Sequence, residues 1–542
     1  MHSFNVLSRR SFLDHSAKVG LGVALSTLVD IPFVMKRALA EGSIGLNGKK
    51  LLFIFLRGAN DALNSVVPIQ DSAYATSRPN ILIPKDSGTD YSALGPSDFL
   101  QSSPDPAAAN FGTFSYANAI RLGNGFAALH PSLKFLAPVY NAGELALIHR
   151  VGYPKQSRSH FDSQNYWENG NPNNNISKDG IFYRTMIESG LAHTAPLTGV
   201  SVQSALPLSL RGSGAAMTNL TDPTRYNLLG IPNNTDGNNK ADNALRAANL
   251  YPFPDKKNRE LLSLQYGNML NTLQIFAGID FSEAGNTFTD DANTDGDTAP
   301  YSLFPTTNAK NGGYAMHANS AAKYVVDTGA YSFFNNLKAA ALVLNKTDAI
   351  IAGTEYGGFD THQAQGAVTG AHANLNRRLG WAIYALRKYF TRYADKSNWN
   401  NLVVVTLSEF GRTTIQNSDA GTDHAEAGVM FVAGGGVKGF QKGNPSGVFA
   451  CSPNDSILPW IPGPANQSGG VDGSMFGVSD RYLKRAVDYR SVLGKLIRDH
   501  LGATQNQVNR IIPGYADSRE KLLSGGTSTI DNTTIAGEVN IV

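Results

Sequence analysis

The sequence predicts an α/β protein whose largely parallel central sheet is flanked by helices on both faces. Short continuous apolar runs that end in Gly-containing turns indicate buried strands, at residues 49–61, 144–152, 348–358, 401–412 and 427–436. Apolar residues at three- to four-residue spacing indicate helices between them, at residues 320–344 and 371–395. Strands that alternate with helices favour a parallel sheet, because each crossover between parallel strands needs a long connection.

The first 40 residues have the pattern of an export signal. Paired arginines in "SRRSFL" (residues 8–13) precede an apolar run, and "ALA" (residues 38–40) supplies a small-x-small end. This start resembles a twin-arginine signal, which a receptor reads as an address. Asp30 and Pro32 interrupt the apolar run, so we expect no stable membrane anchor. We expect the twin-arginine translocase as export partner and a periplasmic or secreted mature chain.

The charge balance argues against nucleic acid as a partner. The whole chain carries 46 Lys and Arg against 43 Asp and Glu, a formal charge of +3. Five of these basic residues and two of the acidic ones fall within the expected signal, so the mature chain is close to neutral. Cys451 is the single cysteine, which excludes an intrachain disulfide. Any metal must therefore be held by histidines and carboxylates.

We expect residues 41–515 to form one domain. Stretches rich in Asn, Asp, Gly and Thr predict a loop-rich insertion around residues 204–313, and residues 480–502 predict an amphipathic helix. Residues 516–542 are small and polar, which is typical of a tail.

The stretch "DANTDGD" within that insertion resembles the start of a calcium loop, with Asp291, Asn293 and Asp295 as ligands. Position twelve is Ser302 in place of the bidentate Glu. A solvated Asp/Asn loop is the favoured alternative.

Polar side chains follow the predicted strands at the points where the strands end. Ligands of parallel α/β sheets bind beyond the carboxyl ends of the strands, so these side chains are expected to share one site. The groups concerned are Arg57 and Asp61, His149 and Arg150, Asp360 and His362, Glu409 and Arg412, and Asp423 and His424 in the loop before the last strand.

This inventory predicts a centre for divalent metal. The oxygen ligands are Asp61, Asp360, Glu409 and Asp423, and the imidazole ligands are His362 and His424. The mixture suits Zn or Mn, with Mg or Ca as alternatives. Two ions about 4 Å apart could clamp the attacking and leaving oxygens of a phosphoryl or sulfuryl transfer.

A hydroxyl nucleophile is available in "SRSHFD" (residues 157–162). Ser159 opens a predicted helix, where free N–H groups could hold an anion, and Ser157 is its rival. The alternative for Ser159 is a simple helix cap. Arg158 and Arg412 could bind an anionic substrate group or pair with nearby acids.

Each metal ligand also has a structural alternative. Asp61 could cap the helix after its turn, Glu409 and Arg412 could form a buried ion pair, and Asp360 could be a turn residue. Of the other histidines, we expect His149 in the core, and His372 at a predicted helix start could lie at the surface.

Five ordered motifs then resemble the exported family numbered 1501 among domains of unknown function. They are "FLRGANDALNSVVP", "SRSHFDSQNYWENG", "GGFDTH", "SEFGRT" followed by "GTDH", and "VDYRSVLGKLI". That family is similar to the alkaline phosphatase-like superfamily, which includes sulfatases. The resemblance implies that fold and a site assembled in chain order.

In that order Asp61 would bind one metal, and Ser159 or Ser157 would be the nucleophile. Asp360 and His362 would be a ligand pair, and His424 the last ligand, with Asp423 as its orienter or a further ligand. The superfamily pattern "VVVTxDH" is replaced here by "VVVTLSEFGR", so Glu409 stands in for the Asp and no His follows it. The resemblance therefore supports the metal at Asp360, His362 and His424 more fully than a second one at Asp61, Ser159 and Glu409.

The expected function is that of an exported metal-dependent hydrolase of phosphate or sulfate esters. Ser159 would attack, and Arg158 or Arg412 would hold the anion of the substrate. The alternative is a non-catalytic exported protein that keeps the fold and binds a glycan or another partner.

Overall fold

The computed structural model describes residues 44–95, 118–192, 197–213, 217–221, 328–442, 446–464, 474–477, 481–516, 523–530 and 533–542, with residues 215 and 326 and short pieces between 267 and 305. The expected signal, residues 1–40, lies outside the described residues. So do the expected calcium ligands Asp291, Asn293 and Asp295, and most of the expected insertion.

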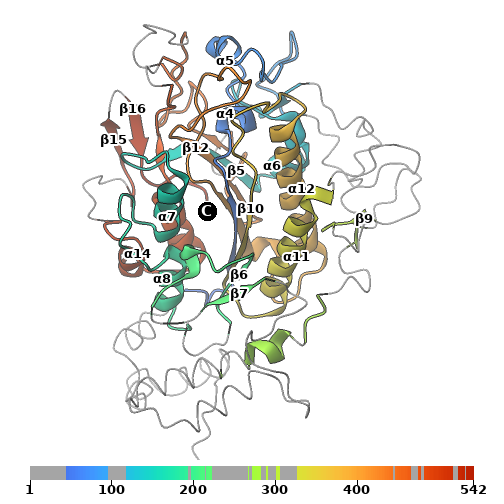
Figure 1. The fold of residues 1–542 in the computed structure, drawn as a ribbon, viewed down its shortest axis with the longest axis vertical. Helices are drawn as coiled ribbons and strands as arrows, with labels where there is room; N and C mark the ends of the chain where they lie inside the picture. The colour runs from blue at the N-terminus through green and yellow to red at the C-terminus, as the bar shows by residue number, and fades with distance from the viewer. Residues whose placement is uncertain are drawn as a thin grey trace, which may run out of the picture.

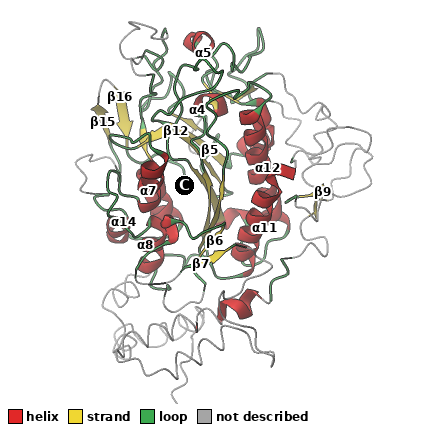
Figure 2. Ribbon diagram, in the orientation of Figure 1, coloured by secondary structure: helices red, strands yellow, loops and turns green. Residues whose placement is uncertain are grey.

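The described chain forms an α/β fold around one mixed, mostly parallel sheet of eleven strands (Figures 1 and 2). The strand order is β15-β16-β14-β5-β12-β11-β1-β10-β6-β7, and β13 pairs with β5 off this path. The strands are β1 (Lys50–Leu56), β5 (Leu145–Gly152), β6 (Gly199–Val202), β7 (Thr218–Leu220), β10 (Ile351–Tyr356), β11 (Leu402–Leu407), β12 (Gly428–Ala433), β13 (Val448–Phe449), β14 (Val487–Asp488), β15 (Thr527–Ile530) and β16 (Thr533–Ala536). All five strands expected from the apolar runs are confirmed.

Helices cover both faces of this sheet. Figure 1 shows α7, α8 and α14 on one side of the strands and α6, α11 and α12 on the other. The described helices are α4 (Ala62–Ser65), α5 (Ser72–Ser77), α6 (Ala137–Asn141), α7 (His160–Asn169), α8 (Ile181–Glu188), α11 (Tyr331–Lys346), α12 (Ala371–Arg392), α13 (Tyr489–Lys495) and α14 (Gln505–Ile511). None of them is long and apolar enough to cross a lipid bilayer.

Strand β1 shows why both faces need cover. All seven of its residues are buried. Leu52, Ile54 and Leu56 belong to the apolar core that contains the residues of α11 and α12, whereas Leu51, Phe53 and Phe55 belong to the core with α8 and α13. Because side chains alternate between the faces of a strand, a strand that is apolar at every position must be buried on both sides.

Strand β12 departs from the expected parallel arrangement. It runs antiparallel to both β11 and β5, while β11, β1, β10, β6 and β7 run parallel to one another. The connection from β11 to β12 contains no helix, so the chain turns back instead of crossing over. The N-terminal end of β12 therefore lies beside the carboxyl ends of β11 and β5.

The C-terminal part also differs from expectation. The helix expected over residues 480–502 is shorter, because β14 pairs with β5 and the Asp488 side chain caps α13 by accepting from the backbone N–H of Arg490 at 3.0 Å. In place of a polar tail, β15 and β16 extend the sheet through β14. Ile541 beyond them is fully buried.

Three small strands form a separate sheet, with β4 (Ala128–Leu129) between β2 (Val66–Val67) and β3 (Ile120–Arg121). A further short pair joins β8 (Thr289–Asp290) to β9 (Tyr301–Ser302).

Candidate metal centre

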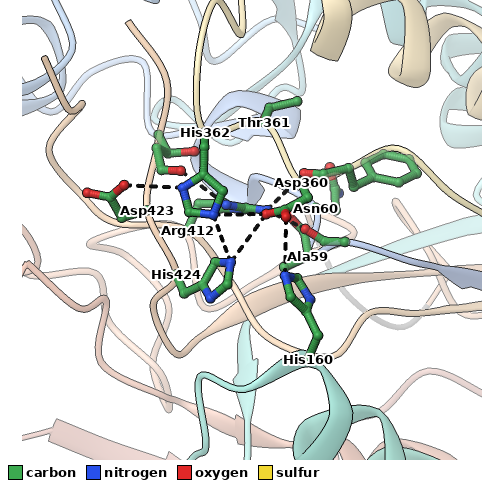
Figure 3. Close-up of polar contacts among 12 residues, drawn as sticks. Ala59, Asn60, His160, Asp360, Thr361, His362, Arg412, Asp423 and His424 are labelled. Carbon is green, nitrogen blue, oxygen red and sulfur yellow. Dashed lines mark hydrogen bonds and ion pairs between the residues drawn. The ribbon is translucent and has the colours of Figure 1, made fainter. Parts of the chain in front are cut away.

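Four side chains meet at the carboxyl edge of the sheet: His160, Asp360, His362 and His424 (Figure 3). Asp360 Oδ1 lies 3.1 Å from His362 Nε2 and 3.2 Å from His424 Nε2. Its other oxygen, Oδ2, lies 3.4 Å from His160 Nε2. The Nε2 atoms of His362 and His424 are 2.9 Å apart. Atoms of His160, Asp360 and His424 all lie within 4.8 Å of one another.

Three separate segments deliver these groups. His160 is the first residue of α7, whose start is fixed by Ser159 as helix cap. Asp360 and His362 lie in the loop that follows β10, and His424 lies in the loop that leads into β12. Arg412 and His424 lie in the single connection between β11 and β12, and an antiparallel bridge between them closes this connection into a hairpin-like loop.

The second ring nitrogen of each histidine is held by an acceptor. His160 Nδ1 lies 2.9 Å from Glu409 Oε1, and His362 Nδ1 lies 3.3 Å from Asp423 Oδ1. His424 Nδ1 lies 2.9 Å from the backbone carbonyl of Arg158. A carbonyl or an ionised carboxylate can only accept, so each Nδ1 carries the proton. Metal-binding histidines in proteins are oriented in the same way.

This tautomer leaves a lone pair on each Nε2 of the neutral rings. Three lone pairs and the Asp360 carboxylate therefore face one another, and His160 Nε2 is buried with no hydrogen-bond partner among the described residues. Electron-rich atoms at this spacing repel unless a cation or a shared proton lies between them. Ligands of tetrahedral zinc at 2.0–2.1 Å are about 3.3 Å apart, close to the separations found here. His160, Asp360 and His424 offer ligand atoms that all lie within 4.8 Å of one another and could hold a divalent ion, and His362 lies next to this trio through His424.

The charges around the centre favour this arrangement. Burial opposes ionisation of Asp360, but the hydrogen bond and charge of Arg412 outweigh it and lower the pKa of the carboxyl group. One effect opposes this arrangement: the hydrogen bond to Glu409 raises the pKa of His160, which favours the protonated ring over the neutral ring that binds metal. Burial, followed by the charge of Arg412, lowers the pKa of His424, which keeps its ring neutral and able to bind metal.

Arg412 organises the centre and does not face the substrate side. Its side chain is fully buried. Its guanidinium donates to the backbone carbonyls of Gly58, Ala59, Phe359 and Thr422, and to Asp360 Oδ1. Of the two roles expected for Arg412, the structure shows the pairing with an acid, because its donors are used within the protein and one of them binds Asp360. The acid is Asp360 and not Glu409, which was the structural alternative.

Glu409 and Asp423 support the histidines from behind. Glu409 is fully buried, and its Oε1 accepts from His160 Nδ1, from Gln164 Nε2 at 3.0 Å and from the backbone N–H of Gly58 at 2.8 Å. Burial opposes its ionisation, but the hydrogen bond from His160 heads the interactions that lower its pKa. The structure thus gives both acids the role of orienting histidines, which for Asp423 was one of the two expected roles.

Asp61 lies outside the cluster. Its carboxylate is fully buried and pairs with Arg78 at 2.6 Å, accepts from Gln365 Nε2 at 2.7 Å, and caps α4 through the backbone N–H of Leu63. These donors occupy the oxygens that a metal would need, so the capping alternative describes Asp61 better than the metal role. Glu409 Oε1 is likewise bound to His160, whereas its Oε2 is buried without a hydrogen-bond partner among the described residues. No second metal centre is assembled among the described residues.

The expected nucleophile lies beside a ligand. Ser159 Oγ caps α7 by accepting from the backbone N–H of Asp162 at 3.4 Å, and Ser157 Oγ accepts from the backbone N–H of Ser159 at 3.2 Å. Arg158 is 43% exposed, stacks over the ring of Tyr482 at 4.4 Å and pairs with Glu426 at 3.3 Å. Arg158 therefore offers a solvent-facing cation next to the centre.

His160 is a candidate ligand that the sequence did not predict. It was visible only as a neighbour of Ser159, although a histidine at the first position of a helix after a strand is well placed for the carboxyl edge. The expectation for His149 is confirmed, because it is fully buried and its Nε2 lies 3.1 Å from the carbonyl of Val66. His372, for which a surface position was open, is fully buried as well.

One comparison with known proteins gives a match. Residues 298–444 match the family model described as "Protein of unknown function (DUF1501)". The match supports that family and includes Asp360, His362 and His424, but not His160. No curated protein and no solved structure matches the chain.

Proposed function

We propose that this protein is an exported metal-dependent hydrolase of phosphate or sulfate esters that uses one divalent ion. The convergence of three histidine Nε2 lone pairs on Asp360 carries the proposal. Three nitrogen ligands and one oxygen favour Zn or Mn over Mg or Ca, which prefer all-oxygen sites. The ion would be held by His160, Asp360, His362 and His424.

Substrate access is the second requirement of the proposal. The side chains of Asp360 and His362 are 44% and 42% exposed, so an ester can approach the ion from solvent. When bound, the ion supplies Lewis-acid polarisation of a phosphoryl or sulfuryl oxygen. Arg158 holds the remaining charge of the anion, and the Ser159 hydroxyl is the attacking group. The Ser159 oxygen bonds to phosphorus or sulfur as the bond to the alcohol oxygen breaks, and the serine proton leaves with the alcohol. Water then hydrolyses the serine ester, which releases the free acid and restores the hydroxyl.

The ester class and the export route follow from the sequence. The ordered motifs resemble a family related to the alkaline phosphatase-like superfamily, and the N-terminus resembles a twin-arginine signal. The proposal departs from the two-metal arrangement implied by that resemblance, because Asp61 is paired with Arg78. The mature protein would act in the periplasm or outside the cell.

The test combines metal analysis with turnover. The mature protein, loaded with Zn or Mn, is incubated with an aryl phosphate, an aryl phosphodiester and an aryl sulfate. Ser159→Asn keeps a helix cap but removes the hydroxyl, so it separates the nucleophile from the fold. We expect one equivalent of metal, turnover of at least one ester, and loss of turnover in Ser159→Asn. Stoichiometric metal without turnover of any ester contradicts the proposal and favours the non-catalytic binder.

A further inference from the structure

Gln365 lies behind the metal centre and contacts three segments at once. It is fully buried. Its Oε1 accepts from the hydroxyl of Thr361 at 2.9 Å and from the hydroxyl of Thr422 at 2.8 Å. Its Nε2 donates to Asp61 Oδ2 at 2.7 Å.

The two threonines belong to the two loops that carry ligands. Thr361 lies between Asp360 and His362, and Thr422 is two residues before His424. The loops are also joined through the backbone, because Thr422 N–H donates to the Thr361 carbonyl at 3.1 Å and Gln365 N–H donates to the Ala420 carbonyl at 3.0 Å. The Gln365 side-chain oxygen thus adds two hydroxyl contacts to the backbone hydrogen bonds that join the two loops next to the candidate ligands.

The direction of the Gln365 amide is fixed by charge. Asp61 is paired with Arg78 at 2.6 Å, and this partner favours the ionised carboxylate. An ionised carboxylate accepts a hydrogen bond and repels a carbonyl oxygen, so the NH₂ group of Gln365 must face Asp61. The carbonyl oxygen is then turned toward the two threonine hydroxyls. Arg78 also donates to the backbone carbonyl of Thr414 at 3.0 Å, which anchors the loop after β11.

We propose that Gln365 is a positioning residue that holds the loop of Asp360 and His362 in register with the loop of His424. This inference rests on the proposed metal centre. Gln365 does not bind the ion. It links the buried Asp61–Arg78 pair to the two loops that carry the candidate ligands, through hydrogen bonds from two threonine hydroxyls.

The test compares Gln365→Met with Gln363→Met. Gln363 is exposed in the same loop, so it is a matched control. Metal affinity is measured by competition with a chelator, and ligand geometry by the visible spectrum of the Co(II)-substituted protein. Hydrogen exchange of Thr422 N–H is measured on metal-free protein. We expect Gln365→Met to bind metal roughly 10–100-fold more weakly, as other outer-shell changes do, with an altered Co(II) spectrum and faster exchange. Gln363→Met should match the unchanged protein.

A second pair guards against misfolding of Gln365→Met. Thr422→Val removes one hydroxyl, whereas Thr422→Ser retains it. We expect weaker metal binding in Thr422→Val and rescue in Thr422→Ser. Equal affinity, an unchanged Co(II) spectrum and unchanged exchange in Gln365→Met and Thr422→Val overturn the inference. If the unchanged protein binds no metal, the metal centre fails, and exchange at Thr422 alone decides whether Gln365 joins the loops.

Discussion

His362 and His424 face each other through their Nε2 atoms at 2.9 Å, and both rings donate from Nδ1 to fixed acceptors. Neither ring can turn away without losing that second hydrogen bond. The contact between the two Nε2 atoms is therefore unfavourable for two neutral rings and needs a shared proton or a cation. If the proposed ion lies between these rings, its removal should destabilise the centre.

Chelation should destabilise the protein. An ion that binds the folded chain and not the unfolded chain adds about 2.7 kcal/mol to the free energy of unfolding when its free concentration is one hundred times Kd. We expect the Tm to fall when the metal-loaded protein is treated with a chelator and to recover when Zn or Mn is added back. Calorimetry of the loaded and chelated forms measures the effect. His424→Ala should show no such dependence, and a chelator-independent Tm in the unchanged protein would argue against the centre.

Replacement of His160 tests the ligand that joins α7 to the centre. His160→Ala removes an Nε2 that lies 3.4 Å from Asp360 Oδ2 and leaves Glu409 without one of its donors. We expect metal affinity to fall more than tenfold, as measured by isothermal titration. Phe161→Ala is the control, because Phe161 is the next residue and is 84% exposed. Equal affinity in both variants would remove His160 from the ligand set.

Gly421 allows the two ligand loops to touch. A Cβ at this position would lie 2.2 Å from the backbone carbonyl oxygen of His362, far inside contact distance. We expect Gly421→Ala to push His424 away from His362 and to weaken metal binding roughly tenfold or more, an effect of the size seen when groups behind a metal site are disturbed. Gly357→Ala is the control, since nothing lies within 4 Å of its added carbon. Chelator competition measures both variants, and matching affinities would contradict the prediction.

Buried histidines should make the fold sensitive to mild acid. Burial lowers the pKa of His130 and His149 to about 3, and that of His372 and His500 to about 4. In the unfolded chain these groups titrate near 6.5. As the pH falls from about 6.5 towards 4.5, the unfolded state binds protons that the folded state excludes, so stability decreases.

The measurement is the free energy of unfolding in denaturant across that range, on chelated protein. His149→Gln should reduce the slope by about one proton, because it removes one of these groups while keeping an amide that can donate to the Val66 carbonyl. A free energy that stays constant between pH 6.5 and 4.5 would show that these rings take up protons in the folded state.

The apolar runs were enough to locate the strands, because a strand buried on both faces has no polar positions that could obscure it. They also brought Asp360, His362 and His424 together, since polar residues at strand ends share one edge of the sheet. The direction of β12 was not predictable from its composition, because parallel and antiparallel strands of a buried sheet have the same apolar pattern. Because β12 is antiparallel, the loop of His424 that precedes it lies at the same edge of the sheet as Asp360 and His362.

The errors concern residues whose role depends on burial and on distant partners. Asp61 and Arg78 are both buried and pair with each other, which composition alone does not reveal. Arg412 follows Glu409 closely in sequence, yet its guanidinium binds Asp360 and four backbone carbonyls instead. His160 has no distinguishing pattern as a ligand in the sequence, because it stands beside the candidate nucleophile Ser159 and no second ligand follows at a fixed spacing.

The order in which the ligands occur along the chain has a consequence for biogenesis. His424 and Asp360 are 64 residues apart, and His160 and its partner Glu409 are 249 residues apart. Ribosome-bound chains that end before the loop of His424 would lack a ligand, and the three segments meet only once the sheet has assembled. Metal uptake would therefore be a late event in maturation, and the loaded ion would mark molecules whose folding is complete.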